Sequence, residues 1–329
     1  MKSILVKERG TADVLEIVEL PKPNVSTSDI LLKISAVGVN FADIMQHQGT
    51  YPFQLPLPYT PGMEMIGIVE SVGSKVKNVE IGERIAAISF MAGGYAEYAV
   101  VKPEQIIPIP NNISDRQALA LLIQGLSAYL LLSYAAKIRH GESILVHAAG
   151  GGVGNLLVQI AKLMNAGDVF GTAGTLQKRD RIKTYGVDYA IDYNSSNWHK
   201  DILEITNGKG INIILDPVGR STTAQNLNCL GVEGRFISYG WLCGDYPSLT
   251  PKQCQTLLFN NQSVSGFAVN VVMERHPDLV ESAFEQLFDW VLQGKLKPVL
   301  GSVFPLEDAA KAHQVILNRE TMGKIILSL

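Results

Sequence analysis

The sequence predicts an α/β protein in which a doubly wound parallel sheet is inserted in a second, mostly β domain. Residues 1–110 hold short β-branched segments separated by many prolines and glycines, whereas residues 121–267 alternate apolar strand-like runs with segments of helical periodicity. A chain of 329 residues also exceeds what one hydrophobic core usually supports. We therefore expect a β domain at 1–120, completed by 268–329, and a parallel-sheet domain at 121–267.

The composition is that of a globular protein and argues against several functional classes. Hydrophobic residues make up 47% of the chain and charged residues 18%, and the formal net charge is -3, so no basic surface for nucleic acid or anionic membranes is expected. Charges close to Met1 leave no apolar core for a signal peptide. The three cysteines are widely spaced and form no CxxC pair, which favours a reducing, cytoplasmic location.

Two segments of the first domain predict strands. Residues 30–37 and 65–72 are rich in β-branched side chains and are bounded by Asp, Gly and Ser. Several short strands joined by Gly- and Pro-rich turns favour a small barrel or sandwich.

The uncharged stretch 117–136 approaches the length of a membrane span. Gln, Gly and Ser residues interrupt it, however, and Arg116 and Lys137 bound it closely. A buried helix that connects the two domains is the better interpretation of this segment.

The alternation that follows is typical of a doubly wound sheet. A long amphipathic helix after residue 270 and a closing strand at 324–327 form a tail too short for a domain of its own, so we expect it to pack on the β domain. Within the sheet domain, strands are expected at 143–148, 169–172, 189–192, 211–215 and 235–239, and helices at 153–165, 177–185, 198–207 and 223–229.

A glycine-rich turn between the first strand and helix of the sheet domain predicts a dinucleotide site. Gly151 would let the backbone approach a pyrophosphate, Gly154 would allow close packing of helix and strand, and the helix N-terminus would offer N–H donors. The turn has the dinucleotide spacing with alanine in place of the first glycine, and its binding residues are Ala149, Gly151, Gly152, Val153 and Gly154.

The end of the second strand selects the cofactor. An NAD site places Asp or Glu there to bind the ribose 2′-OH, but residues 171–178 contain no acid. Hydroxyls and a following lysine suit a 2′-phosphate, which favours NADPH, bound by Thr172, Gly174, Thr175 and Lys178. The alternative is that Lys178 is a solvated helix charge.

A series of motifs in order along the chain resembles one enzyme group. The motifs are GVNFAD at 38–43, PGME at 61–64, the glycine turn, DPVG at 216–219 and the closing Gly323-Lys324. The sequence is similar to the zinc-free quinone oxidoreductase (zeta-crystallin) group of the medium-chain dehydrogenase/reductases, in its vesicle-amine-transport-protein-like branch, with polyketide enoyl reductases as relatives. The resemblance implies a GroES-like β-barrel catalytic domain plus a Rossmann domain.

The same resemblance implies further contacts. Lys178, Tyr193 and Arg319 fall where relatives hold the 2′-phosphate of NADPH. A homodimer joined through the sheet edge around residues 263–267 is also implied. The nicotinamide half of the cofactor would be lined by Asn40, Gly240, Trp241, Leu242 and Phe267.

Departures from the alcohol dehydrogenase pattern predict that no metal is bound. Met63 stands where those enzymes carry a histidine ligand, and the segment around Asp43 contains no cysteine. Without a metal there is no Lewis acid to lower the pKa of an alcohol, so the expected acceptors are already electrophilic, such as quinones and α,β-unsaturated carbonyls. The expected substrate pocket includes Asp43, Tyr59 and Gln124.

Tyr51 is the candidate general acid, because enoyl reductases that resemble this chain carry a proton-donating tyrosine at the matching place. The alternative is an aromatic wall of the cofactor or substrate pocket. Three functions therefore stay open: a quinone or enone reductase, an enoyl-thioester reductase of a fatty-acid or polyketide pathway, and a non-enzymatic NADPH-binding protein.

Overall fold

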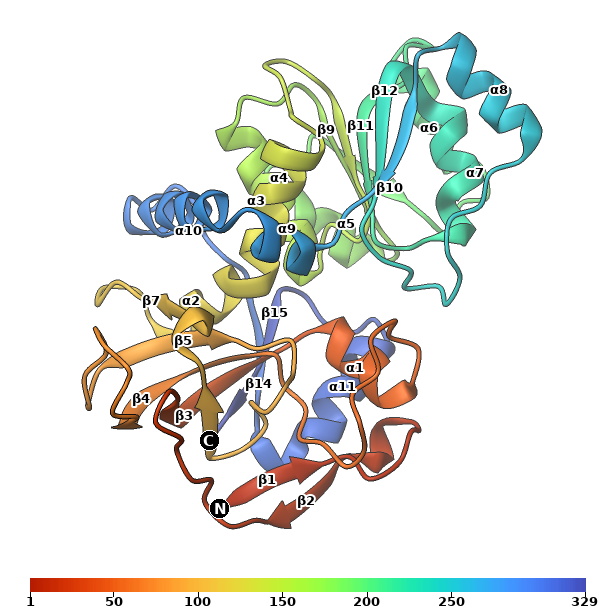
Figure 1. The fold of residues 1–329 in the computed structure, drawn as a ribbon. Coiled ribbons are helices and arrows are strands. Elements are labelled where there is room, and N and C mark those ends of the chain that lie inside the picture. Colours follow the sequence, from red (N-terminus) through yellow and green to blue (C-terminus); the bar gives the residue numbers. More distant parts are fainter. The chain divides into compact units, whose positions relative to one another are not determined.

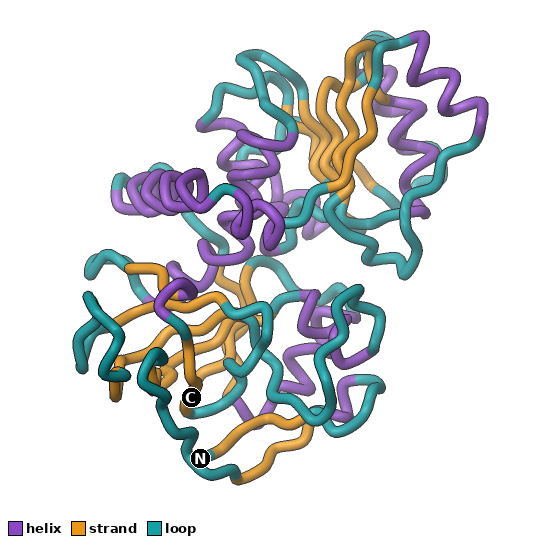
Figure 2. The backbone as a smooth tube through the Cα atoms, in the orientation of Figure 1, coloured by secondary structure: helices purple, strands orange, loops and turns teal.

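The computed structural model describes residues 1–329 and divides into two compact units. Residues 1–123 and 298–329 form the first, which we call the barrel unit, and residues 124–297 form the second, which we call the Rossmann unit. Each unit has a sheet of its own (Figures 1 and 2).

The barrel unit is built on a seven-stranded sheet of mostly antiparallel neighbours, in the order β14-β15-β3-β4-β5-β7, with β6 also paired to β3. A separate hairpin-like pair, β1 and β2, completes its strands. The bounds are β1 (Lys2–Leu5), β2 (Glu16–Glu19), β3 (Ile30–Val39), β4 (Glu64–Val72), β5 (Arg84–Ile88), β6 (Tyr98–Val101), β7 (Ile106–Pro108), β14 (Leu300–Pro305) and β15 (Lys324–Ser328).

The helices of the barrel unit are short. Helix α1 ends at Gly49, whose φ of 75° lies in the left-handed region that favours glycine. Apolar side chains from β3, β4, β15 and α11 form one core, which includes Leu32, Met65 and Leu327. The helical segments are η1 (Ala12–Val14), α1 (Phe41–Gln48), η2 (Pro103–Gln105), α2 (Asp115–Ala120), η5 (Leu306–Asp308) and α11 (Ala309–Leu317).

The Rossmann unit has a six-stranded, wholly parallel sheet in the order β10-β9-β8-β11-β12-β13. Helix α4 lies on one face, and α6 and α7 lie on the other (Figure 1). The strands are β8 (Ile144–Val146), β9 (Val169–Ala173), β10 (Tyr189–Asp192), β11 (Ile211–Asp216), β12 (Leu230–Ser238) and β13 (Ser263–Gly266). The helices are η3 (Leu121–Gly125), α3 (Leu126–Leu130), η4 (Leu131–Ala135), α4 (Gly152–Leu163), α5 (Leu176–Lys183), α6 (Trp198–Ile205), α7 (Arg220–Cys229), α8 (Pro251–Phe259), α9 (Val269–Arg275) and α10 (Pro277–Leu292).

The predicted fold class is confirmed, a barrel-like domain with an inserted doubly wound sheet, but the second domain boundary differs. The prediction placed residues 268–297 with the β domain, whereas they pack in the Rossmann unit. The apolar face of α10 lies on α3, and the rings of Trp290 and Tyr129 are 5.9 Å apart. Only the last part of the tail, residues 298–329 with β14, η5, α11 and β15, returns to the barrel unit.

The uncharged stretch forms a helix from Asp115 to Ala135, and the chain passes from the barrel unit to the Rossmann unit within it. By length and composition this helix could cross a membrane, but 67% of its most apolar window is buried inside the protein. This burial agrees with the predicted connecting helix, since a core helix of a globular protein meets the same criteria.

Candidate active site

The predicted dinucleotide turn joins β8 to α4. A Cβ atom on Gly154 would lie 2.2 Å from the carbonyl oxygen of Ala148, so only glycine fits where the helix passes over the turn. Gly151 is the N-cap of α4, and the first-turn N–H groups of such a helix have no intrahelical partner and suit an anion. The buried side chain of Asn155, which sequence reasoning missed, donates to the carbonyl oxygens of Gly151 (2.8 Å) and Gly152 (2.7 Å).

Gln124 lies against this turn. A Cβ atom on Gly152 would meet its side-chain oxygen at 2.0 Å, so the amide fills the space that the glycine leaves open. The sequence assigned Gln124 to the substrate pocket; in the Rossmann unit it is a neighbour of the cofactor turn.

Most of the residues expected at the 2′-phosphate follow the carboxyl end of β9 or of β10, whereas Arg319 belongs to the barrel unit. A Cβ atom on Gly174 would lie 2.6 Å from the hydroxyl of Tyr193, and Thr175 caps α5 by accepting from the backbone N–H of Lys178 at 3.2 Å. Arg179, which sequence reasoning missed, forms an ion pair of 2.7 Å with Asp192. The acid that ends β10 is therefore already neutralised by a neighbouring arginine.

Thr172 has a structural role next to the glycine turn. Its side chain is buried, and its hydroxyl accepts from the backbone N–H of Ala148 at 3.2 Å and lies 3.3 Å from Nδ1 of His147. Its hydroxyl therefore connects β9 to the glycine turn and stabilises the turn. A direct cofactor contact of this hydroxyl stays a prediction.

The segment that follows β12 is fixed to the end of β11. The N–H of Leu242 donates to the carbonyl oxygen of Pro217 at 2.9 Å, and the N–H of Phe267 donates to Ser238 at 2.9 Å. Because carboxyl ends of parallel strands meet at one edge of a sheet, Gly240, Trp241, Leu242 and Phe267 follow the same edge as the glycine turn.

Five of the predicted residues belong to the barrel unit: Asn40, Asp43, Tyr51, Tyr59 and Arg319. Asn40 is part of a buried ionic cluster. Its amide nitrogen donates to Oε1 of Glu64 at 2.9 Å, and its oxygen accepts from Nζ of Lys324 at 3.0 Å. Lys324 also forms an ion pair with Oε1 of Glu64, and both side chains are fully buried. Sequence reasoning quoted Glu64 and Lys324 within motifs but did not pair them.

Asp43 is also fully buried, and the charge of Lys324 lowers the pKa of its carboxyl by less than burial raises it. Its Oδ2 accepts from the backbone N–H of Asn40 at 2.9 Å at the start of α1, and its Oδ1 has no hydrogen-bond partner. Burial is the main cause that raises the pKa of this carboxyl to about 7, with the charge of Glu64 adding to the rise.

The two candidate pocket tyrosines follow α1. Tyr51 is half-buried, and burial, with a smaller contribution from the charge of Asp43, raises the pKa of its phenol. Tyr59 is more enclosed, at 8% exposed, and the guanidinium of Arg9 lies 5.3 Å from the centre of its ring. Burial raises the pKa of Tyr59 to about 12 despite that neighbouring cation.

Two histidines and a tyrosine form a buried hydrogen-bond chain beside α1. Nδ1 of His47 lies 2.9 Å from the carbonyl oxygen of Gly10, and its Nε2 lies 3.1 Å from Nδ1 of His313 on α11. Nε2 of His313 is 2.9 Å from the hydroxyl of Tyr95. This arrangement gives both histidines a structural role, because they join α1 to α11.

The donor set for a metal is not assembled. No group of three or more His, Cys, Asp or Glu side chains lies together as a metal site requires. Met63, at the position of the missing histidine ligand, is buried.

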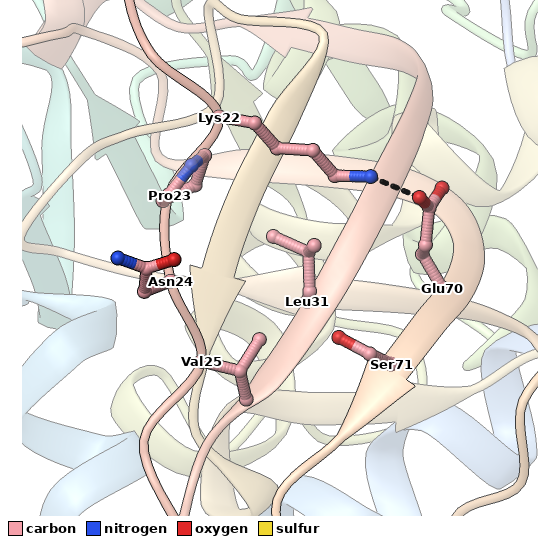
Figure 3. Close-up of a pocket in the computed structure, with 7 residues that line it drawn as sticks. All are labelled: Lys22, Pro23, Asn24, Val25, Leu31, Glu70 and Ser71. Carbon is pink, nitrogen blue, oxygen red and sulfur yellow. Dashed lines mark hydrogen bonds and ion pairs between the residues drawn. The ribbon is translucent and has the colours of Figure 1, made fainter.

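Two surface cavities contain none of the predicted residues. One, of about 400 Å³, lies under the strap 22–25 of the barrel unit, where Lys22 reaches across Leu31 to an ion pair with Glu70 (Figure 3). The other, of about 560 Å³, is lined by Arg139, Glu142 and Arg235 at the amino ends of the Rossmann strands. The second cavity lies at the opposite end of the Rossmann strands from the glycine turn.

Comparison with known proteins supports the assignment of both units. Residues 26–111 match the family model of the alcohol dehydrogenase GroES-like domain, and residues 185–327 match that of a zinc-binding dehydrogenase. The quinone oxidoreductase of Rattus norvegicus is 33% identical, covering 100% of this chain and 98% of the relative.

A second relative is longer than this chain. The synaptic vesicle membrane protein VAT-1 homolog of Danio rerio is 32% identical over 94% of this chain, which spans 66% of that protein, just under two thirds. Among solved structures, the Escherichia coli quinone oxidoreductase complexed with NADPH superposes with a TM-score of 0.93 at 30% identity, covering 100% of both chains.

Proposed function

Because the chain belongs to the quinone oxidoreductase group of the medium-chain dehydrogenase/reductases, we propose that it transfers hydride from NADPH to a quinone or an α,β-unsaturated carbonyl. Two observations carry this proposal: one unit contains a dinucleotide turn, and the other contains acids and phenols but no group of three potential metal ligands. An acceptor that is already electrophilic needs no Lewis acid.

The chain's own residues fit NADPH. The turn that a Cβ at Gly154 would block offers helix N–H groups to the pyrophosphate, and Lys178 with Tyr193 and Arg319 would hold the 2′-phosphate. The bound nicotinamide supplies the hydride. The protein has to orient it, to exclude water and to place a proton.

Tyr51 is the proton donor in this proposal. Its neutral phenol at physiological pH can donate to the carbon next to the carbonyl after hydride has reached the β-carbon. This favours enones and enoyl thioesters as a second substrate class, whereas a reduced quinone takes its protons from water.

A turnover screen tests the function. Purified protein with NADPH is offered quinones, enones and a crotonyl thioester, and NADPH oxidation is followed by absorbance. We expect turnover of at least one quinone or enone. Tight NADPH binding without turnover of any acceptor would leave the non-enzymatic NADPH-binding protein as the function.

The proposal includes a homodimer. Strand β13 is an exposed sheet edge beside α8, a helix with no buried residue, on which Leu258 is 78% and Phe259 81% exposed. An unpaired strand edge next to exposed apolar side chains favours pairing with a second copy. Sedimentation should give a dimer, and Leu258→Glu with Phe259→Glu should shift it to monomer.

The cytoplasmic location expected from the cysteines is also part of the proposal. All three, Cys229, Cys243 and Cys254, are free thiols, as in a reducing compartment. A fluorescent fusion found in an oxidising compartment would contradict it.

A further inference from the structure

A network of hydrogen bonds between buried side chains runs across the carboxyl ends of three Rossmann strands. Oδ2 of Asp216, at the end of β11, accepts from the amide of Asn226 on α7 at 2.7 Å. The other side of that amide lies 2.7 Å from Nε2 of His147, which follows β8. Nδ1 of His147 lies 3.3 Å from the hydroxyl of Thr172 on β9. All four residues are at most 1% exposed, so each has to find its partners inside the protein.

The directions of these hydrogen bonds follow from the Asp216 end of the network. A carboxylate only accepts, so the group of Asn226 that faces Asp216 is its NH₂ group. The carbonyl oxygen of Asn226 therefore faces His147, and Nε2 of His147 has to carry a proton and donate it. Nδ1 of His147 is then left to accept from the hydroxyl of Thr172.

The network ends at a strained residue of the glycine turn. Ala148 has a φ of 51°, in the left-handed region that is costly for a residue with a side chain. Its N–H donates to the hydroxyl of Thr172 at 3.2 Å. Its carbonyl oxygen accepts from the N–H of Gly151, the N-cap of α4, at 2.9 Å. The hydroxyl of Thr172 therefore holds the residue from which the turn starts.

The other end of the network reaches the segment that is expected to line the nicotinamide. Oδ1 of Asp216 accepts from the N–H of Val218 at 2.5 Å, and the carbonyl oxygen of Val218 accepts from the N–H of Cys243 at 2.9 Å. Cys243 directly follows Leu242 in the sequence. One network thus connects the two segments that are expected to bind the two halves of the cofactor.

We propose that His147 is a positioning residue for NADPH. It accepts from the hydroxyl of Thr172 and thereby holds Ala148 in the left-handed conformation of the glycine turn. The inference rests on the proposed function and deepens it, because it names a side chain outside the turn that fixes the shape of the turn. His147 is too buried to touch the cofactor, so it acts through the turn. Without this acceptor, the hydroxyl of Thr172 is free to turn away from Ala148.

The test measures the affinity of His147→Phe for both nicotinamide cofactors by fluorescence titration. Phenylalanine keeps a ring at the edge contact with Trp198, whose ring centre lies 5.2 Å away, and deletes both nitrogens. NADPH and NADH should each bind about tenfold more weakly, which corresponds to about 1.4 kcal/mol, because the pyrophosphate is common to both. His140→Phe, at an exposed position of the same unit, should bind both as wild type does. Unchanged affinities in His147→Phe, or a loss confined to NADPH, would overturn the proposal.

A double-mutant cycle shows whether His147 acts through Ala148. Glycine adopts a positive φ without the cost that alanine incurs, so Ala148→Gly removes the need to hold this residue in place. His147→Phe should therefore lower the NADPH affinity of Ala148→Gly much less than it lowers that of wild type. Equal losses in both backgrounds would show a general defect of the Rossmann unit and would refute the positioning role.

Thr172→Val gives a second variant in case His147→Phe does not fold. Valine keeps the shape of threonine and suits a strand, but it deletes the hydroxyl that accepts from the N–H of Ala148. The loss of affinity should again affect both cofactors and should again shrink in the Ala148→Gly background. A loss that stays at full size in that background would speak for a direct cofactor contact of Thr172 and against the network.

Nitrogen NMR of isotope-labelled wild type gives a readout that needs neither a variant nor turnover. The imidazole of His147 should carry a proton on Nε2 and none on Nδ1. A proton on Nδ1 would overturn the role of His147 while leaving NADPH binding intact. A wild type that binds neither cofactor fails the proposed function instead, and the positioning role with it.

Discussion

His313 donates the hydrogen bond that it shares with His47, and the bond can run in no other direction. The carbonyl oxygen of Gly10 only accepts, so Nδ1 of a neutral His47 carries the proton and its Nε2 accepts from Nδ1 of His313. Nε2 of His313 then accepts from the hydroxyl of Tyr95. The chain ties α11 to α1, the helix that carries Asp43 and leads to Tyr51.

These hydrogen bonds predict that the barrel unit loses stability in acid. Burial lowers the pKa of His313 to about 3, so the folded state holds fewer protons than the unfolded state between that value and the ordinary 6.5. The contribution of neutral His313 to the free energy of unfolding is present in full above pH 6.5 and is lost as the pH falls toward 3. Each pKa unit corresponds to about 1.4 kcal/mol.

We expect His313→Phe to destabilise the barrel unit by about 1–3 kcal/mol at pH 7.5, because Tyr95 loses its buried acceptor, and to weaken the pH dependence below 6.5. Tryptophan fluorescence would report on the Rossmann unit, because that unit contains all three tryptophans, Trp198, Trp241 and Trp290. The measurement is therefore hydrogen exchange of peptides from α1 and α11. His140→Phe, at an exposed position, is the control. Equal exchange in both variants would refute this structural role.

Lys178→Ala should lower NADPH affinity selectively. Wild type is expected to bind NADPH at least tenfold more tightly than NADH, which corresponds to about 1.4 kcal/mol. The substitution removes a cation from the first turn of α5, the helix that follows β9, and should leave NADH binding unchanged. Nicotinamide fluorescence titration measures both affinities. Lys183→Ala, on the exposed side of the same helix, should behave as wild type, and equal affinities for the two cofactors would contradict the prediction.

The cofactor half of the site could be predicted from local sequence, and the rest could not. The glycine turn and the acid-free end of β9 are contiguous, so their spacing carries their geometry. His47 and His313 are 266 residues apart, and Glu64 and Lys324 are 260 apart, so only the folded barrel unit brings the members of each pair together. The orphaned oxygen of Asp43 depends on that pairing and has no local signature.

The second domain boundary, predicted at residue 268, was misplaced for a similar reason. The amphipathic pattern of α10 predicts an apolar face but not its partner, and α3 covers that face within the Rossmann unit. Arg179 escaped notice because a charge on a helix start is usually solvated, whereas here it neutralises Asp192.

We expect activity without zinc. The prediction rests on the side chains present: Met63 replaces a ligand, and no group of three potential ligands is assembled. Elemental analysis should find no stoichiometric zinc in the active protein, and dialysis against a chelator should leave turnover as it was. About one zinc per chain, lost together with activity, would be the contrary result.

Tyr51→Phe separates the quinone and enoyl functions. The substitution keeps the ring and its edge contact with Phe53, whose centre lies 6.3 Å away, and deletes only the hydroxyl. If the phenol protonates the α-carbon, kcat/KM for an enoyl substrate should fall by about 10²- to 10⁴-fold. The loss for a quinone should be much smaller, because solvent protonates the reduced oxygens.

The measurement is the ratio of wild-type to variant kcat/KM for one quinone and one enoyl thioester, with NADPH affinity determined in parallel. Phe53→Leu, at a side chain that is 68% exposed, controls for changes in ring packing. A loss confined to the enoyl substrate identifies Tyr51 as the donor, since the same protein, cofactor and hydride step serve both acceptors. An equal, small loss on both would reduce Tyr51 to a wall of the pocket, because a group that only packs against the acceptor cannot distinguish carbon from oxygen protonation.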